Sequence, residues 1–209
     1  MPTKSQDRRK VRLSRALGIP LTPKAAKYLE KRPYAPGEHG RTKRKQDSDY
    51  AVRLREKQRL REQYGIREKQ MRNTFNEARR KDGLTGENLV ELLEQRLDAL
   101  VLRAGFARTT AQARQAVVHR HILVDGKIVD RPSFRVKPGQ VIHVKDKSEQ
   151  LEPFQVAAAG GHVDVLPKVP GYLEVELDKL QARLTRRPRR VEVPVQVDVQ
   201  LVVEYYAAR

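Results

Sequence analysis

The residues with the clearest capacity for chemistry are two histidines, His119 and His121, which flank Arg120. An isolated His-x-His pair can ligate a metal ion, but nothing nearby supplies a third ligand at a suitable spacing. The pair lies directly before a segment that we interpret as a strand. Polar contacts from the end of a helix to RNA are the better interpretation, and we expect no metal site.

No other group of residues indicates catalysis. Gly37 and Gly40 lie in a Pro-Gly-Glu-His-Gly run that lacks the strand, loop and helix of a nucleotide phosphate loop. Glu91 and Glu94 lie on a leucine-rich helix, most simply as its solvent face. The chain has no cysteine, which excludes a disulfide framework and a thiolate metal site. We expect no catalytic residue, no cofactor and no enzyme.

The charge of the chain is its strongest signal. The 209 residues include 44 Lys and Arg against 26 Asp and Glu, a formal net charge of +18. Such a chain repels itself unless a polyanion neutralises it, and nucleic acid is the usual polyanion. Hydrophobic residues, at 38%, still allow a core. Because we find no signal peptide and no apolar run of about 20 residues, we expect a soluble cytoplasmic protein.

More than half of the excess charge lies in residues 1–46. Their several Pro and Gly and few large apolar residues predict a basic arm that becomes ordered against its partner. The run 41–45 is too concentrated to serve solubility alone. We therefore prefer contact with nucleic acid to the alternative of a solubilising tail.

A strongly basic helix follows the arm. Ser48 or Asp49 can cap this helix, and Gly65 ends it. One interpretation is a solvated helix held by pairs such as Glu56 with Arg59. We prefer a helix that contacts phosphates, because basic residues recur around it at positions 53, 55, 57, 59 and 61.

Further helices and a small sheet are expected after it. Apolar stripes at about 67–81 and 87–104 predict a helical bundle. Thr109 and Gln112 have the spacing of a capping box, and Asp125-Gly126 indicates a hairpin with a type I′ turn between strands at 122–124 and 127–129. Alternation predicts other strands at 141–144, 172–177 and 191–193, and β propensity alone predicts one at 197–206.

The mode of recognition follows from what the chain lacks. With four Phe, seven Tyr and no Trp, base stacking on a sheet is not the main mode. No recognition helix of a DNA-binding protein is apparent. We favour basic helix faces that contact phosphates and 2′-hydroxyl groups of a folded RNA.

Several stretches together carry a specific resemblance to a known family. They are 32–40, 48–58, 96–98, 105–107, 112–115, 119–122 and 124–126. Together they resemble the bacterial small-subunit ribosomal protein S4 family, in its cysteine-free, zinc-independent form. The later stretches resemble the small RNA-binding module named after that protein. The similarity is dense over about residues 30–150 and looser to the C-terminus.

The resemblance implies a structural component of the small ribosomal subunit. Members bind a multi-helix junction of the small-subunit rRNA, initiate assembly of the body there, contact ribosomal protein S5, and line the region where mRNA enters. In some bacteria they repress their own operon. The RNA-binding module is inserted into a helical domain whose last helix is the C-terminus, so we expect 198–206 to be helical despite its propensity.

The fold class that results is α+β. It comprises a basic N-terminal arm, a small helical domain and an inserted α/β RNA-binding domain with a small antiparallel sheet. The expected boundaries are 1–46 for the arm, 47–95 with 197–209 for the helical domain, and 96–196 for the RNA-binding domain, whose S4-type module covers about 96–160.

The resemblance also transfers RNA contact to particular residues, with the run 41–45 near the surface where mRNA enters. The expected RNA-binding residues are Arg32, Arg41, Lys43, Arg44, Lys45, Tyr50, Arg53, Arg55, Lys57, Arg59, Arg61, Arg108, Thr109, Gln112, Arg114, Gln115, His119, Arg120 and His121.

Two positions depart from the family pattern. Val11 and Ser14 stand about where many relatives have a pair of zinc-binding cysteines, so we expect RNA and apolar contacts to order the arm. Thr110 stands where an arginine is common, and Arg108 lies two residues earlier.

Two other functions were weighed. One is a non-ribosomal RNA-binding regulator or chaperone that carries the same module. The other is an RNA-modifying enzyme such as a pseudouridine synthase, which needs a large catalytic domain that this chain has no room for.

Overall fold

The computed structural model describes residues 4–42 and 47–208. The expected contacts of Lys43, Arg44 and Lys45 lie outside these described residues.

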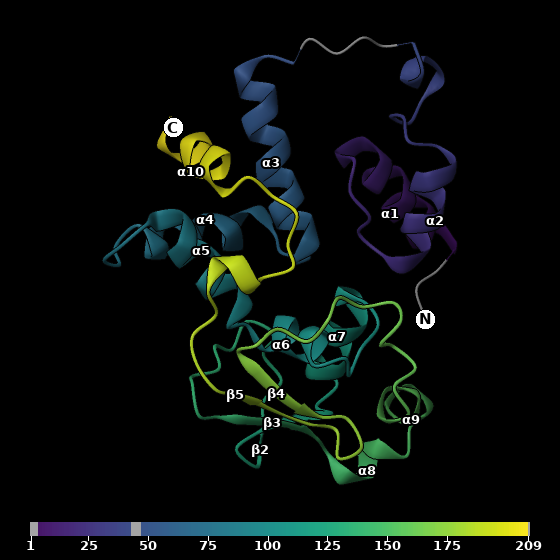
Figure 1. Ribbon diagram of the computed structural model, residues 1–209, viewed down its shortest axis with the longest axis vertical. Coiled ribbons are helices and arrows are strands. Elements are labelled where there is room, and N and C mark those ends of the chain that lie inside the picture. The colour runs from purple at the N-terminus through teal and green to yellow at the C-terminus, as the bar shows by residue number, and fades with distance from the viewer. Residues whose placement is uncertain (1–3, 43–46, 209) are drawn as a thin grey trace. The chain divides into compact units, whose positions relative to one another are not determined.

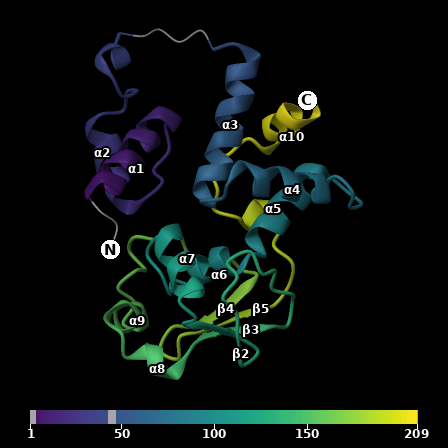
Figure 2. The same ribbon diagram turned by 180° about the vertical axis from the view of Figure 1, so that it is seen from behind.

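Two compact units make up the chain, which Figures 1 and 2 show from opposite sides. One combines residues 1–71 with the C-terminal residues 195–209, and the other is the continuous stretch 72–194. In the part of the chain that is described, all strands belong to the second unit. None of the described helices is both long and apolar enough to cross a membrane.

The first unit consists of helices and connecting loops. In chain order its elements are α1 (Lys4–Leu17), α2 (Pro23–Lys31), the 3-10 helix η1 (Glu38–Gly40), α3 (Asp49–Gln63) and α10 (Val199–Ala207). A further helix, α4 (Glu68–Ala78), runs from the first unit into the second.

The N-terminal segment is more regular than we expected for an arm that folds against a partner. The Thr22 hydroxyl caps α2 by accepting a hydrogen bond of 3.2 Å from Ala25 N, and Pro23 occupies the first turn. Leu17 at the end of α1 and Ile19 between the two helices are buried. Local capping and a small apolar contact therefore give this segment helices of its own.

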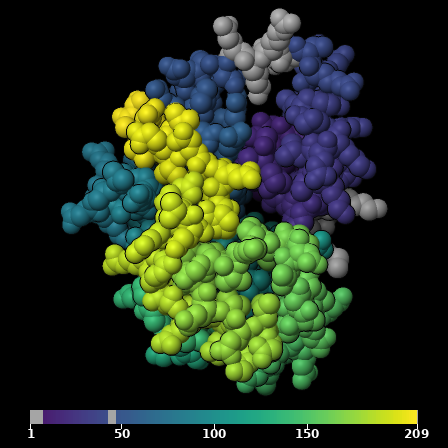
Figure 3. Space-filling view, viewed as in Figure 1, coloured from purple at the N-terminus to yellow at the C-terminus, as the bar shows by residue number. Residues whose placement is uncertain are grey.

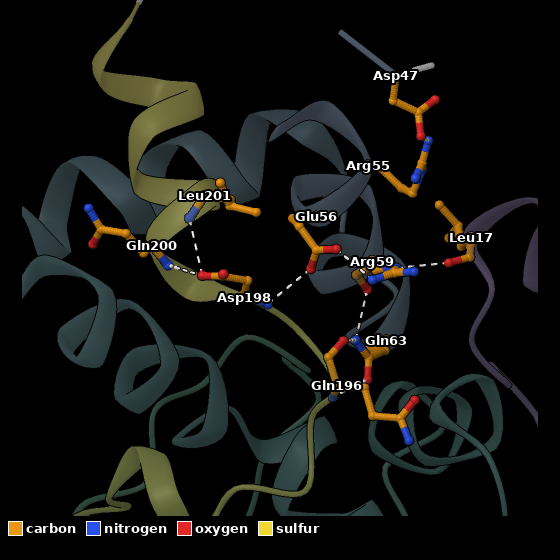
Figure 4. Close-up of polar contacts among 10 residues, drawn as sticks. All are labelled: Leu17, Asp47, Arg55, Glu56, Arg59, Gln63, Gln196, Asp198, Gln200 and Leu201. Atoms are coloured by element: carbon orange, nitrogen blue, oxygen red, sulfur yellow. Dashed lines mark hydrogen bonds and ion pairs between the residues drawn. The ribbon is translucent and has the colours of Figure 1, made fainter. Parts of the chain in front are cut away.

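The C-terminal helix α10 packs against α3. The Asp198 carboxylate caps it by accepting hydrogen bonds from Gln200 N at 3.0 Å and Leu201 N at 3.4 Å (Figure 4). This confirms the helix that the resemblance implied, and packing overrides the β propensity of the segment. The buried face consists of Val202, Tyr205 and Tyr206.

The second unit combines helices with one sheet. Its helices are α5 (Thr85–Glu94), α6 (Leu97–Arg103), α7 (Thr110–Val118), α8 (Asp146–Glu149), α9 (Glu152–Ala158) and the 3-10 helix η2 (Arg190–Glu192). Its strands are β1 (Ile122–Val124), β2 (Lys127–Ile128), β3 (Val141–Val144), β4 (Leu173–Glu176) and β5 (Gln181–Leu184).

The five strands form an antiparallel sheet in the order β2-β1-β3-β5-β4. Positive φ angles at both Asp125 (49°) and Gly126 (77°) confirm the predicted type I′ hairpin turn. One face of the sheet is buried, for example at Ile122 and Ile142, and α6 and α7 lie on one side of it in both ribbon views. Helices and this small sheet confirm the predicted α+β class.

The helix predicted at 87–104 is interrupted between α5 and α6. Val136 N donates to Gln95 O at 2.9 Å, and Leu97 N donates to Phe134 O at 2.8 Å. These bonds draw the backbone out of the helix. The leucine stripe continues across the break, so periodicity alone did not reveal it.

Three other differences arise from local geometry. The strand predicted at 191–193 is wrong, because Glu192 N donates to Arg189 O at 3.0 Å and forms η2. The sheet instead gains β5, which pairs with β3 and β4 and which alternation did not predict. The helices α8 and α9, green in Figure 3, were also not predicted.

A buried ion pair links α5, α6 and the residue before β4. Glu94, expected on the solvent face, is fully buried, which corrects that prediction. Arg103 donates to both of its carboxylate oxygens, with the shortest contact at 2.7 Å, and the Tyr172 hydroxyl donates to it at 2.9 Å. Burial, reinforced by the charge of Glu94, raises the pKa of Tyr172. The phenol therefore acts as a permanent donor.

We expect Tyr172→Phe to lower the free energy of unfolding by about 1.5–3 kcal/mol, because a hydrogen bond to a buried charge is lost. Glu94→Ala should cost more, about 3–5 kcal/mol, because it leaves Arg103 without this partner. Urea unfolding of the full chain measures both. A Tyr172→Phe protein as stable as the wild type would contradict the role given to the phenol.

Candidate nucleic-acid interface

Helix α7 begins at the residue that the sequence indicated. The Thr109 hydroxyl accepts a hydrogen bond of 3.2 Å from Gln112 N, which confirms the cap. The Gln112 side chain accepts one of 2.8 Å from Arg108 N, one residue before the cap. The buried side of the helix consists of Ala113, Ala116 and Val117. The side chains left exposed at its start and along it include Arg108, Arg114 and Gln115.

The turn after α7 adds two more exposed groups. His121 N donates to Ala116 O at 3.0 Å, which forces Arg120 into the left-handed region at φ +62°. Residues other than Gly are uncommon there, and such strained positions gather at functional sites. The Arg120 side chain is 69% exposed and lies 3.2 Å from Asp130, while His119 is exposed beside it.

His121 points to a different place from its neighbours. Its Nδ1 lies 2.9 Å from the hydroxyl of Ser148 on α8, and its ring meets Phe154 of α9 edge-on at 5.7 Å. Lys145 N donates to the His121 carbonyl at 2.8 Å. The structure therefore brings His121 to α8 and α9, where it holds these helices against the end of α7.

A buried ion pair lies beneath α7. Arg96 donates to both carboxylate oxygens of Asp98, at 2.9 and 2.6 Å, and both residues are buried. Burial raises the pKa of Asp98 although Arg96 and Arg114 oppose this effect. The Arg114 guanidinium lies 3.7 Å from Asp98 and is still 44% exposed. Asp98 can therefore orient Arg114 while leaving donors that face solvent.

The cations of α3 reach partners within the first unit. Lys57 is buried, with Glu68 at 2.8 Å and the Tyr205 ring at 4.8 Å. These contacts favour the alternative of a helix held by ion pairs, at least for part of the charge. The remaining pairs are Arg53 with Glu204 at 2.9 Å, Arg55 with Asp47, Arg59 with Glu56 at 2.5 Å, and Arg61 with Glu62 at 2.7 Å.

Two carboxylates, Glu56 and Glu68, each accept hydrogen bonds from a cation of α3 and from the C-terminal segment. Glu56 accepts from Arg59 and, at 2.9 Å, from Asp198 N at the start of α10 (Figure 4). Glu68 accepts from Lys57 and from the Tyr206 hydroxyl at 2.9 Å. Burial opposes ionisation of Glu68, but these hydrogen bonds outweigh it and lower its pKa. Tyr50, by contrast, is 53% exposed at the start of α3.

A cluster around Tyr34 shapes the segment 32–41. The Arg15 guanidinium donates to the carbonyls of Tyr34 at 3.1 Å and Ala35 at 3.3 Å, and lies 4.9 Å from the centre of the Tyr34 ring. Arg41 also lies over this ring, at 5.1 Å. Gly40 is required nearby, because a Cβ atom there would lie 1.9 Å from Ala35 O.

Hydrogen bonds therefore order the arm, besides the apolar contacts that we expected. The buried Ser14 hydroxyl donates to Lys10 O at 2.8 Å and accepts from Leu21 N at 3.2 Å. Ser14 and Arg15 were not predicted to organise the arm, since neither forms part of a recognisable motif.

The predicted Arg32 and Arg41 are exposed. Other exposed cations were not predicted, because they lie outside the motif stretches. The exposed cations of α1 and α2 that were not predicted are Arg8, Arg9, Arg12, Lys24, Lys27 and Lys31. Within the described residues, no group of three or more His, Asp or Glu is placed to hold a metal ion.

Comparison with known proteins gives a consistent result over the whole chain. Residues 6–94 match the ribosomal protein S4/S9 N-terminal domain, and residues 95–142 match the S4 domain. The chain is 82% identical over 209 residues to the small ribosomal subunit protein uS4 of Clavibacter michiganensis and to that of Clavibacter sepedonicus, with the full length of both chains covered. It is also 82% identical to the protein of this name from Leifsonia xyli, over 98% of this chain and 99% of the relative.

We expect Arg15→Lys to loosen the segment 32–41 although the charge is kept, because an ammonium cannot replace the planar guanidinium on these carbonyls. Trypsin should cleave after Arg41 several-fold faster. Arg12→Lys, an exposed position on the same helix, is the matched control. Equal cleavage rates in both variants would contradict the role of Arg15.

The pH dependence of stability tests His121. Burial first, and then the charges of His119 and Lys145, lower the pKa of His121 below its ordinary value of 6.5. In the unfolded chain His121 takes up a proton near pH 6.5, whereas in the folded protein it does so only at lower pH. The contribution of neutral His121 to the free energy of unfolding is therefore complete above pH 6.5 and is lost as the pH falls below it.

In His121→Gln, the free energy of unfolding should fall less between about pH 7.5 and about pH 5 than it does in the wild type. Urea unfolding at several pH values in this range measures it. The exposed His39 provides the control variant His39→Gln. If wild type and His121→Gln lose stability in parallel, His121 is not the group responsible.

Proposed function

Because the chain belongs to the small ribosomal subunit protein uS4 family, we propose that it binds a multi-helix junction of the small-subunit rRNA, initiates assembly of the body there and lines the region where mRNA enters. Membership of the family makes it a structural component of the small ribosomal subunit, with an S4 RNA-binding domain, and not an enzyme.

The single observation that carries the proposal is the exposed side of α7 with the turn that follows. It presents three arginines, Arg108, Arg114 and Arg120, beside side chains that can donate or accept hydrogen bonds. Arginine forks suit phosphate oxygens, whereas amides and imidazole suit 2′-hydroxyl groups and base edges. Such a mixture supports recognition of RNA shape. The hydrogen-bonding members are Gln112, Gln115 and His119.

The helix α3 is the second part of the proposed interface, where arginines that also bind carboxylates contact phosphates. Its arginines remain between 25% and 35% exposed while they hold carboxylates. A guanidinium has five N–H donors, so it can bind a carboxylate and still contact a phosphate. Lys57 is 5% exposed and has an ammonium enclosed by Glu68 and Tyr205, so its contribution is to place the others.

The proposed mRNA contact involves the arm. Arg41, held over Tyr34, is the described cation of this group, which also includes the run 43–45; the exposed Arg32 is proposed as a further RNA contact of the arm. Contact with ribosomal protein S5 is proposed on the family relationship alone.

A non-ribosomal RNA-binding regulator is the alternative function. Identity of 82% over the full length of relatives named as small-subunit proteins favours the ribosomal role. Sedimentation of a lysate separates the two, because a regulator stays in the soluble fraction and off the small subunits.

The α7 surface is tested by Arg108→Gln/Arg114→Gln in the full chain. We expect about a tenfold or greater loss of affinity for the rRNA junction and a smaller loss for random RNA, because contacts that read shape are removed together with charge. Arg131→Gln/Lys137→Gln, two exposed cations of the same unit, is the charge-matched control. Equal losses on both RNAs would refute specific recognition by α7.

A further inference from the structure

A second concentration of charge lies outside the surface described so far. Residues 186–190 contain four arginines around Pro188; they follow β5 and end at the first residue of η2. Figure 3 shows this stretch, yellow-green, on the face in view. Figures 1 and 2 place η2 beside α5, away from α7. The function proposed above does not use these arginines.

The backbone of this segment sorts the arginines into two pairs. Arg189 is extended, with φ −99° and ψ 144°, and side chains alternate sides along an extended chain. Pro188 is buried, so its neighbours Arg187 and Arg189 point outward together, about 6.6 Å apart along the chain. Arg187 is 72% exposed, and Arg189 is exposed as well.

The other two arginines hold the segment in shape. Arg186 donates to both carboxylate oxygens of Glu192, at 2.7 and 2.5 Å, which closes the turn. Arg190 donates to Val193 O at 3.4 Å. Arg187 and Arg189 therefore lie on a fixed backbone, which lowers the entropic cost of binding a partner.

The carboxylates near the outward pair are shared with other cations. Glu192, which interacts with the charge of Arg189, already holds Arg186. Glu91 lies 3.8 Å from Arg187, but it also lies 3.7 Å from Lys81 and accepts a hydrogen bond from Gln95. One carboxylate is thus shared by two cations. The local excess of positive charge remains at the surface.

We propose that Arg187 and Arg189 form a second contact to RNA phosphates, separate from α7. The proposal rests on the RNA-binding function proposed above and extends it to a new site. RNA suits this segment better as a partner than an acidic protein surface does. The exposed side chains of the segment are arginines, and Val191 is its single exposed apolar side chain. Stable protein interfaces have an apolar, aromatic centre that this surface lacks.

The test compares Arg187→Gln/Arg189→Gln with wild type in the full chain, by filter binding to the rRNA junction at several salt concentrations. Each lost phosphate contact lowers the slope of log affinity against log salt by about 0.7 to 0.9, so we expect a decrease of about 1.4 to 1.8. Affinity should fall roughly tenfold at about 0.15 M salt, on cognate and random RNA alike.

Two further variants complete the design. Lys147→Gln/Lys168→Gln removes the same charge from exposed positions elsewhere in the unit and should leave the slope near that of the wild type. Arg187→Lys/Arg189→Lys should restore most of the slope, because a phosphate contact depends chiefly on charge.

An unchanged slope in Arg187→Gln/Arg189→Gln overturns the proposal. So does normal RNA binding combined with poor incorporation into reconstituted subunits, since that result assigns the pair to a protein partner. A wild-type chain that binds no RNA refutes the proposed function itself, which separates that failure from the failure of this site.

Discussion

Carboxylates inside the protein decide which of its many cations serve folding. A carboxylate buried without donors is strongly unfavourable, and a chain of net charge +18 has cations in excess to supply them. The buried Glu56 and Glu94 and the partly exposed Glu68 each accept hydrogen bonds from two or more groups, and each joins segments distant in the sequence. α3 appears in the sequence as a polycation, yet its charges are largely engaged in holding its own unit together. The cations proposed to contact RNA keep guanidinium donors at the surface even where a carboxylate lies nearby, as Asp98 does 3.7 Å from Arg114.

Two of these carboxylates join α3 and the start of α4 to the C-terminal segment. Glu56 binds Asp198 N and Glu68 binds the Tyr206 hydroxyl, across 142 and 138 residues. Gln63 reinforces this closure through two hydrogen bonds of 3.1 Å with the backbone of Gln196 (Figure 4). The entropy of closing a loop grows slowly with its length, so a whole inserted unit adds little to the cost of this closure. The geometry of α3 therefore depends on residues at the very end of the chain.

Features set by local chemistry could be predicted from the sequence, whereas features set by distant partners could not. The Thr109 cap, the Asp125-Gly126 turn and the α+β class follow from nearby residue types, and the structure confirms them. The break at Gln95 depends on backbone groups near residue 135, and the burial of Glu94 depends on Tyr172. The helix after Asp198 required the family resemblance, because its β propensity is overridden only by packing on α3. For the candidate site, the sequence pointed to the α7 region. It could not show that Arg114 faces solvent whereas His121 packs against α8 and α9.

The separation of cations into two groups also determines how the protein responds to salt. Ion pairs at shielded positions, such as Arg103 with Glu94 and Arg96 with Asp98, are screened little by mobile ions. Exposed contacts to phosphates are exchanged for counterions and weaken steeply as salt rises. Ionic strength therefore acts on binding well before it acts on the fold. Because the buried pairs hold the backbone at salt concentrations that weaken the proposed phosphate contacts, the protein can release RNA bound in this way and keep the fold that presents its contact residues.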